Sequence, residues 1–129
     1  MREIDIMGKI DHPNIIKLYG KEVSNTKILL AYELCSSKTF GQYLEEQGAL
    51  SEEPDALKFF NQIAGALSAL FELGVVHRDV KPDNIFMTID GSEGIKLGDL
   101  GCARESETNM TGRVGTPYYR APEIHFHPD

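Results

Sequence analysis

Cysteine is scarce in this 129-residue sequence, which has only Cys35 and Cys102. Two cysteines make no disulfide framework, so a reducing compartment, cytoplasmic or nuclear, fits the chain best. No apolar run approaches the ~20 residues that a membrane-spanning helix needs. The first five residues are largely charged and lack the apolar core of a secretion signal. We therefore expect an intracellular protein that has no membrane partner.

Basic residues are also in deficit, because 13 Lys and Arg stand against 20 Asp and Glu and give a net charge of −7. This balance argues weakly against nucleic acid as a partner. It is compatible with basic peptides, although the excess carboxylates could equally be solvated surface. Neither internal repeats nor low-complexity segments are visible, and the length allows one compact domain at most.

Apolar periodicity and turn residues predict a mixture of helices and short strands. We expect helices over 2–10, 39–47 and 51–73, the last one capped by Ser51 and ended by Gly74. Strands are expected over 15–19, 27–34, 85–87 and 95–97, with turns at 12–14, 24–26 and 90–92. The run 27–34 is nearly continuous in apolar residues, which predicts a strand that is buried on both faces.

Polar and titratable side chains concentrate in the stretch His77-Arg78-Asp79-Val80-Lys81-Pro82-Asp83-Asn84. On composition alone this cluster is equally well an ordinary solvated turn. Two later motifs change that balance, namely Asp99-Leu100-Gly101 and Ala121-Pro122-Glu123. A second carboxylate beside a glycine is what a metal–phosphate site needs opposite the first carboxylate.

The order of these three motifs resembles the catalytic loop, metal-binding loop and activation segment of protein kinases of the serine/threonine type. The resemblance extends over nearly all of residues 2–125. It implies a partial protein kinase-like α+β fold, in which 1–35 are the end of the small lobe and the hinge. Residues 36–129 would then be the start of the large lobe, with its catalytic loop and activation segment.

The implied activity is transfer of the γ-phosphate of Mg-ATP to Ser/Thr hydroxyls of protein substrates. By resemblance Asp79 is the catalytic base, which aims a hydroxyl and accepts its proton. Lys81 would neutralise the transferred group, and its presence favours a serine/threonine substrate. Asn84 and Asp99 would hold Mg²⁺ together with the phosphates of ATP, because Mg²⁺ prefers hard oxygen ligands.

The same resemblance places adenine against a hinge at Tyr32-Glu33-Leu34-Cys35. The backbone carbonyl of Glu33 and the backbone amide of Cys35 would bond its edge, and Phe86 would form the apolar floor beneath it. Both assignments have plain alternatives. The hinge stretch is also a strand that leads into a loop, and Phe86 also suits simple core packing.

Four residues are implied to regulate or align the site. Glu3 would pair with an ATP-holding lysine, although it also suits a solvated acid in the first turn of a helix. A phosphate added to Thr111 by an upstream activating kinase could dock on Arg78. Thr111 could instead be an unmodified loop residue, with Thr108 and Ser106 as competing sites. Thr116 would bond Asp79 and Lys81.

The chain departs from the family pattern in two ways. It contains neither a Gly-x-Gly-x-x-Gly loop nor a Val-Ala-Ile-Lys strand, so we expect a fragment of a kinase domain. The alternative is a catalytically inactive, pseudokinase-like binding module. The residue after Asp99 is Leu100 rather than the usual Phe, which we do not read as inactivating. His77 is expected to be a packed structural histidine.

Overall fold

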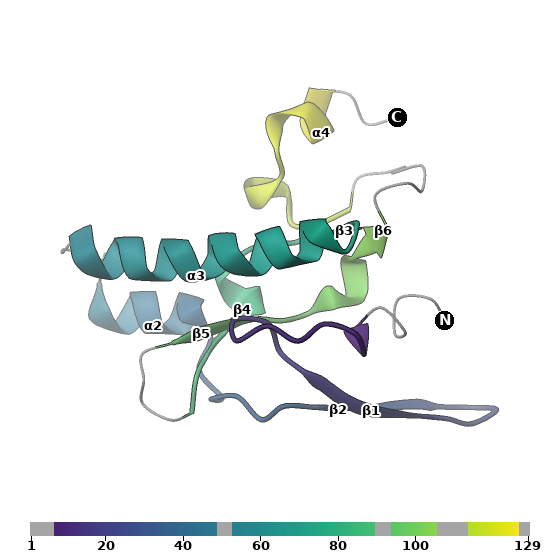
Figure 1. Ribbon diagram of the computed structural model, residues 1–129. Helices are drawn as coiled ribbons and strands as arrows, with labels where there is room; N and C mark the ends of the chain where they lie inside the picture. Colours follow the sequence, from purple (N-terminus) through teal and green to yellow (C-terminus); the bar gives the residue numbers. More distant parts are fainter. Residues whose placement is uncertain (1–6, 49–52, 90–93, 106–113, 127–129) are drawn as a thin grey trace.

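The computed structural model describes residues 7–48, 53–89, 94–105 and 114–126, and Figure 1 draws the remaining residues as a thin grey trace. Within the described residues the strands form antiparallel pairs. Strand β1 (Leu18–Val23) pairs with β2 (Ile28–Tyr32), β3 (Val75–Val76) with β6 (Arg104–Glu105), and β4 (Ile85–Met87) with β5 (Ile95–Leu97). The helices are α2 (Phe40–Gln47), α3 (Glu53–Glu72) and α4 (Pro122–Phe126).

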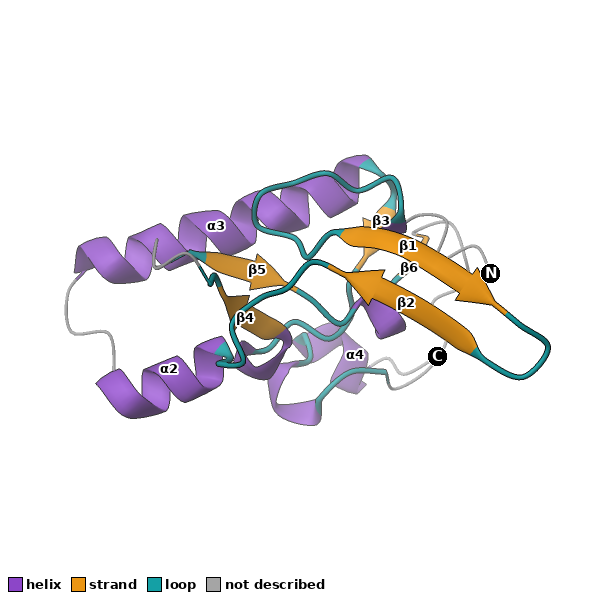
Figure 2. Cartoon of the chain, turned by 90° about the horizontal axis from the view of Figure 1, so that it is seen from below, coloured by secondary structure: helices purple, strands orange, loops and turns teal. Residues whose placement is uncertain are grey.

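Helix α3 is the longest of the described helices, and α2 lies beside it in both views (Figures 1 and 2). The β4–β5 pair lies near these two helices. The β1–β2 hairpin extends away on one side, and α4 lies on the opposite side of α3 (Figure 1). Three short 3₁₀ turns, Pro82–Asn84, Leu100–Cys102 and Pro117–Tyr119, fall in the segments between these elements.

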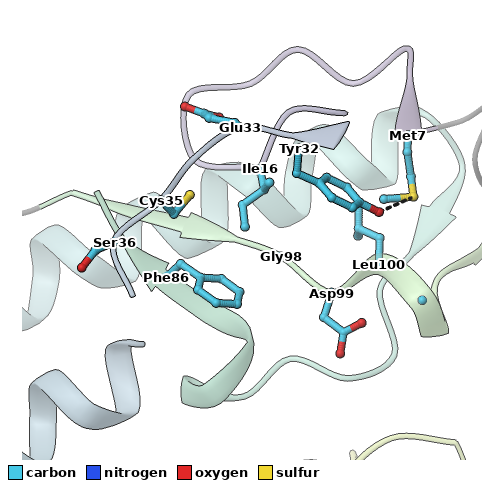
Figure 3. A pocket seen from close by; sticks show the side chains of 11 residues that line it. Met7, Ile16, Tyr32, Glu33, Cys35, Ser36, Phe86, Gly98, Asp99 and Leu100 are labelled. Carbon is cyan, nitrogen blue, oxygen red and sulfur yellow. Dashed lines mark hydrogen bonds between the residues drawn. The ribbon is translucent and has the colours of Figure 1, made fainter. Parts of the chain in front are cut away.

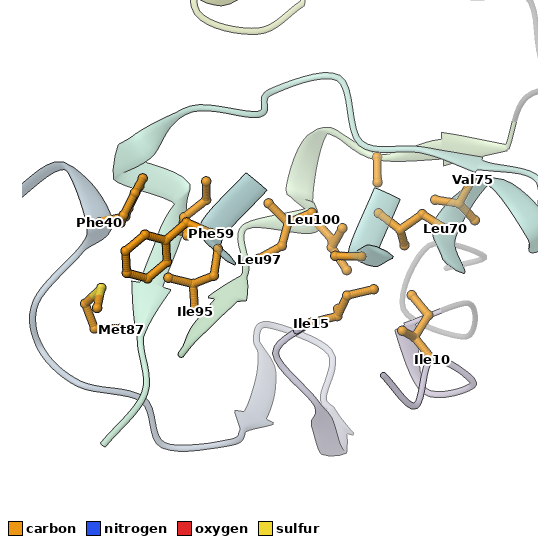
Figure 4. Packing of buried hydrophobic residues seen from close by; sticks show 13 residues of the cluster. Ile10, Ile15, Phe40, Phe59, Leu70, Val75, Met87, Ile95, Leu97 and Leu100 are labelled. Carbon is orange, nitrogen blue, oxygen red and sulfur yellow. The ribbon is translucent and has the colours of Figure 1, made fainter. Parts of the chain in front are cut away.

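The hydrophobic core forms where α3 meets the β4–β5 pair and the segment before β1 (Figure 4). Leu70, Ile15, Ile95 and Leu97 are the largest side chains that are fully buried. At the α2 end the ring of Phe59 packs against Phe40, with ring centroids 4.9 Å apart and planes tilted by 54°. Burial of each such side chain contributes about 1.5–3 kcal/mol, so this contact fixes α2 against α3.

Helix α2 confirms the prediction for 39–47, because a capping box sets its first turn. The Gln42 backbone amide donates to Thr39 Oγ1 at 3.3 Å, and the Thr39 amide donates to Gln42 Oε1 at 2.9 Å. These two bonds satisfy donors that the helix start would otherwise leave unpaired. The helix ends at Gly48, whose φ of 78° is a conformation that glycine adopts without a steric cost.

Helix α3 confirms the long helix that was predicted, and Gly74 with φ of 68° follows its end. The predicted N-cap, Ser51, lies outside the described residues. The wide apolar stripe is only partly buried, since Phe60 is 66% exposed and Phe71 is 76% exposed. Within the described ranges no helix is both long and apolar enough to cross a membrane.

The prediction that strand 27–34 is buried on both faces is wrong. The strand is shorter, and Ile28 and Leu29 are 57% and 59% exposed. The pair β1–β2 is a two-stranded ribbon, and its apolar side chains remain accessible because the described part of the chain covers neither face. A run of apolar residues does not reveal how many neighbours its strand has.

The first strand also differs from its predicted range of 15–19. It begins at Leu18 and runs to Val23, while Ile15 forms an isolated bridge with Leu97 of β5. The helix expected over 2–10 lies mostly outside the described residues, which begin at Met7 and continue as a turn through Lys9. The strands predicted at 85–87 and 95–97, and the turn at 24–26, are confirmed.

One amide side chain joins α3 to two other segments. Gln62 Oε1 accepts a hydrogen bond from the Ile95 backbone amide at 2.9 Å and another from Asn14 Nδ2 at 3.2 Å. Asn14 Nδ2 also donates to the Ile95 carbonyl at 2.9 Å. These bonds tie the turn before β1 and the start of β5 to the middle of the long helix.

We predict that Gln62→Ala lowers the free energy of unfolding by about 1–3 kcal/mol, because it leaves the Ile95 amide donor without its acceptor in a partly buried site. Chemical denaturation of the protein measures this loss. Asn61→Ala is the matched control, since Asn61 is the exposed neighbour on the same helix and its change should stay within about 0.5 kcal/mol. Equal effects of the two substitutions would contradict the role given to Gln62.

Candidate active site

A cavity of about 400 Å³ opens between the β1–β2 ribbon and the β4–β5 pair, a size that suits a small-molecule ligand. Ile16 and Tyr32 border it on one side and Phe86 on the other (Figure 3). Asp99 lines the same cavity and is exposed. The cavity thus has a mainly apolar lining with a carboxylate at its border.

Gly98 sets the width of this cavity. A Cβ atom at that position would lie 2.6 Å from Ile16 Cδ1 and 2.9 Å from the ring of Phe86. Only glycine allows these two side chains to approach the backbone so closely. Sequence reasoning missed this residue, although it directly precedes the motif Asp99-Leu100-Gly101.

The Asp79 carboxylate is held by three other residues of the site. Its Oδ1 accepts hydrogen bonds from the backbone amide of Thr116 at 2.7 Å and from Thr116 Oγ1 at 2.8 Å. Its Oδ2 accepts one from Asn84 Nδ2 at 3.0 Å and lies 3.3 Å from Lys81 Nζ. Lys81 Nζ also donates to Thr116 Oγ1 at 2.7 Å, so the predicted bonds of Thr116 to Asp79 and Lys81 are both present.

These contacts determine the ionisation of Asp79. Partial burial raises the pKa of its carboxyl, but the hydrogen bonds from Thr116, Asn84 and Lys81 outweigh burial and leave the pKa below its ordinary value. Asp79 is therefore a carboxylate at neutral pH, with both oxygens fixed in direction.

The His77 imidazole bridges the Asp79 segment to the Asp99 segment. Its Nδ1 accepts a hydrogen bond from the backbone amide of Asp79 at 3.3 Å, and its Nε2 lies 2.9 Å from the carbonyl oxygen of Gly98. Since Nδ1 is an acceptor, Nε2 carries the proton in the neutral ring. Burial lowers the pKa of His77, which is only 3% exposed, so the ring stays neutral at pH 7.

A second bond supports the same bridge, because the Gly98 backbone amide donates to the Asn84 carbonyl at 2.9 Å. Asn84 is buried and also donates from Nδ2 to the Asp79 carbonyl at 2.9 Å. Asp79, Asn84 and Asp99 therefore belong to one connected site, although twenty residues separate the first from the last.

Two non-glycine residues in the described chain have positive φ, namely Arg78 at 67° and Asp99 at 54°. Each directly precedes or carries a carboxylate of the site. A left-handed backbone is uncommon for residues other than glycine and is found most often at functional sites. These backbone conformations help to set the directions in which the side chains of Asp79 and Asp99 point.

The predicted hinge borders the cavity, as Glu33 and Cys35 both line it (Figure 3). The Glu33 carboxylate faces elsewhere, because its Oε1 lies 2.9 Å from Lys96 Nζ in β5. Lys96 Nζ also donates to the Pro13 carbonyl at 2.9 Å, which links the hinge to the turn before β1. Burial raises the pKa of the Cys35 thiol, so it stays protonated.

Two predicted site residues, Glu3 and Thr111, lie outside the described residues. Arg78 is half-buried and borders a separate cavity of about 350 Å³ with Val114, Arg120 and Ile124. Sequence reasoning also missed Arg120, whose guanidinium bonds backbone carbonyls next to Thr116. No local sequence signal marks such a contact.

Among the described residues, no three His, Cys, Asp or Glu side chains gather where they could hold a metal ion by themselves. Asp99 offers a carboxylate and Asn84 an amide oxygen, and the backbone bond from Gly98 to Asn84 joins their segments. This donor set fits Mg²⁺, which takes few protein ligands and keeps water or phosphate oxygens as the others.

The chain matches the family model described as protein kinase domain over residues 1–127. It is 41% identical over 127 residues to calcium-dependent protein kinase 5 of Plasmodium berghei (strain Anka), and the match covers 95% of this chain and 22% of that protein. It is 38% identical over 128 residues to serine/threonine-protein kinase Nek9 of Mus musculus, with 96% of this chain and 13% of that protein covered.

A similar match, 35% identical over 132 residues, is serine/threonine-protein kinase ULK1 of Homo sapiens, with 95% of this chain and 12% of that protein covered. The chain therefore spans less than a quarter of the length of each of these relatives. The fold, the linked carboxylates and the family match agree, and the chain belongs to the protein kinase family, with serine/threonine kinases as its relatives.

Proposed function

We propose that the chain carries the catalytic centre of a protein kinase that transfers the γ-phosphate of Mg-ATP to Ser/Thr hydroxyls of proteins. The observation that carries this proposal is the connected set of Asp79, Lys81, Asn84 and Thr116 next to a cavity that Asp99 borders. Transfer of a phosphoryl group depends mainly on positioning and charge stabilisation, and this set supplies both.

Asp79 is proposed to aim the attacking hydroxyl and to accept its proton as the bond to phosphorus forms. Thr116 occupies Oδ1 with two short bonds, which leaves Oδ2 as the oxygen that meets the substrate. The longest contact on Oδ2 is that of Lys81 Nζ at 3.3 Å, and it is the contact most easily given up. Because its pKa is low, Asp79 orients the hydroxyl first and takes the proton late.

The cavity is proposed to hold the nucleotide. Phe86 offers a flat apolar surface for adenine, and the backbones of Glu33 and Cys35, which also line the cavity, are proposed to bond its polar edge. Mg²⁺, when bound, neutralises phosphate charge, and Asn84 and Asp99 are the residues that would hold it. The positive charge of Lys81 is proposed to neutralise the transferred phosphoryl group.

Regulation is proposed to act through the activation segment. A phosphate on Thr111, added by an upstream activating kinase, would meet the guanidinium of Arg78, the residue beside the base. Glu3 is proposed to orient a lysine that contacts the phosphates. Both roles rest on the resemblance of the sequence to kinases.

We predict that Asp79→Asn lowers kcat on the order of 10²- to 10⁴-fold, because the amide cannot accept the proton of the substrate hydroxyl. Phosphate transfer to a mixture of Ser/Thr peptides, catalysed by the full-length product of the gene, measures the effect. The affinity for Mg-ATP should be unchanged. Asp83→Asn is the matched control, since Asp83 is an exposed carboxylate of the same loop.

The same assay separates the two candidate functions. An Asp79→Asn variant as active as the wild type would contradict the assignment of the base. A wild-type protein that binds Mg-ATP but transfers no phosphate to any peptide would support the inactive binding module instead. We expect transfer, because Asp79, Lys81, Asn84 and Asp99 all carry the side chains that the reaction requires.

We predict that removal of Mg²⁺ with EDTA weakens ATP binding by at least about tenfold, which corresponds to roughly 1.4 kcal/mol. Asp99→Asn should abolish most of this dependence on Mg²⁺, because it removes the cavity carboxylate that is proposed to hold the ion. Calorimetric titration with ATP, in the presence and absence of Mg²⁺, measures both effects. An ATP affinity of the wild type that is the same with and without Mg²⁺ would contradict the metal assignment.

A further inference from the structure

The Arg120 guanidinium bonds the backbone of the segment that reaches Asp79. Its Nε lies 3.0 Å from the Val114 carbonyl oxygen and 3.0 Å from that of Gly115, and its Nη2 donates to the Gly115 carbonyl at 2.6 Å. Arg120 itself is half-buried and directly follows the 3₁₀ turn Pro117–Tyr119. Charged donors of this kind form the stronger class of hydrogen bond.

Gly115 needs such an anchor because it has no side chain of its own to hold it. Its φ is 86°, and a Cβ atom there would collide with the carbonyl oxygen of Arg78. The glycine therefore rests directly on the backbone beside Asp79. A glycine with free torsions would leave this arrangement readily unless its carbonyl were fixed from outside.

The anchored peptide passes directly into Thr116, whose backbone amide and Oγ1 both donate to Asp79 Oδ1. The Gly115 carbonyl that Arg120 binds and the Thr116 backbone amide belong to one planar peptide unit. Rotation of that unit would swing the Thr116 amide away from the carboxylate. The position of Arg120 and the direction of Asp79 are thus mechanically coupled.

We infer that Arg120 is a positioning residue, which clamps the carbonyls of Val114 and Gly115 and thereby holds Thr116 against the Asp79 carboxylate. The inference deepens the proposed function and rests on it for its effect on catalysis. The clamp itself is a statement about geometry and can be tested without activity.

The first test compares wild type, Arg120→Met and Arg120→Lys in the full-length protein. We expect Arg120→Met to lower kcat on the order of 10- to 100-fold, since misplacement of a reacting group has effects of this size. The KM for ATP should stay within about twofold, because Arg120 does not line the nucleotide cavity. Arg120→Lys should lower kcat by an intermediate amount, because the ammonium group of lysine lacks the planar guanidinium that binds both carbonyls. Lys27→Met, an exposed change in the hairpin turn, is the control.

The second test reads the backbone amide of Thr116 by NMR hydrogen exchange. This amide donates to Asp79 Oδ1 at 2.7 Å, and the clamp predicts that it exchanges at least about tenfold faster in Arg120→Met than in wild type. An unchanged exchange rate at Thr116 in a folded Arg120→Met protein would overturn the inference. A wild type without phosphate transfer would refute the proposed function alone, because the exchange measurement still decides the clamp.

A double-mutant cycle with Thr116→Ala separates positioning from a general loss of stability. If Arg120 acts through Thr116, the double variant should lose much less activity than the product of the two single losses. Single losses that multiply fully would show that Arg120 acts by another route. Arg120→Lys serves in place of Arg120→Met if melting curves show that the methionine variant is unfolded.

Discussion

Four hydrogen bonds and ion contacts on the Asp79 carboxylate hold this structure's chemical centre together. A partly buried charge is costly unless its oxygens are satisfied, and here Thr116, Asn84 and Lys81 satisfy them. Thr116 is more than thirty residues away along the chain, so the contact joins the loop after β3 to the segment before α4. The active-site geometry is therefore a property of this long-range closure.

His77 makes a second link, between the Asp79 segment and the segment that carries Asp99. Its ring is a rigid spacer between the amide of Asp79 and the carbonyl of Gly98, and it works only while one nitrogen accepts and the other donates. Burial, which lowers the pKa of the ring, protects that neutral state. The structural role assigned to His77 from the sequence thus has a chemical basis in its hydrogen bonds.

The sequence predicted elements well where the signal is local. The helix over 39–47, the glycine after α3 and the strands on both sides of 90–92 are predicted from patterns within a few residues. The burial of strand 27–34 was mispredicted, because burial depends on what covers a sheet and not on its own side chains. The motif residues at Asp79 and Thr116 were predicted to meet only through a family resemblance. The contacts of Gln62, Gly98 and Arg120 depend on three-dimensional packing, which a single sequence does not encode in any local pattern.

The left-handed backbone at Arg78 lowers the stability of the fold at a position next to the Asp79 carboxylate. An arginine with φ of 67° has a steric cost of order 1–3 kcal/mol, whereas an aspartate such as residue 99 tolerates that region more easily. Glycine at position 78 would relieve this steric cost but would also remove the guanidinium next to Asp79. A laboratory selection for heat tolerance alone would therefore favour glycine there, and the selected variants would lack the side chain that is proposed to bind a phosphate on Thr111.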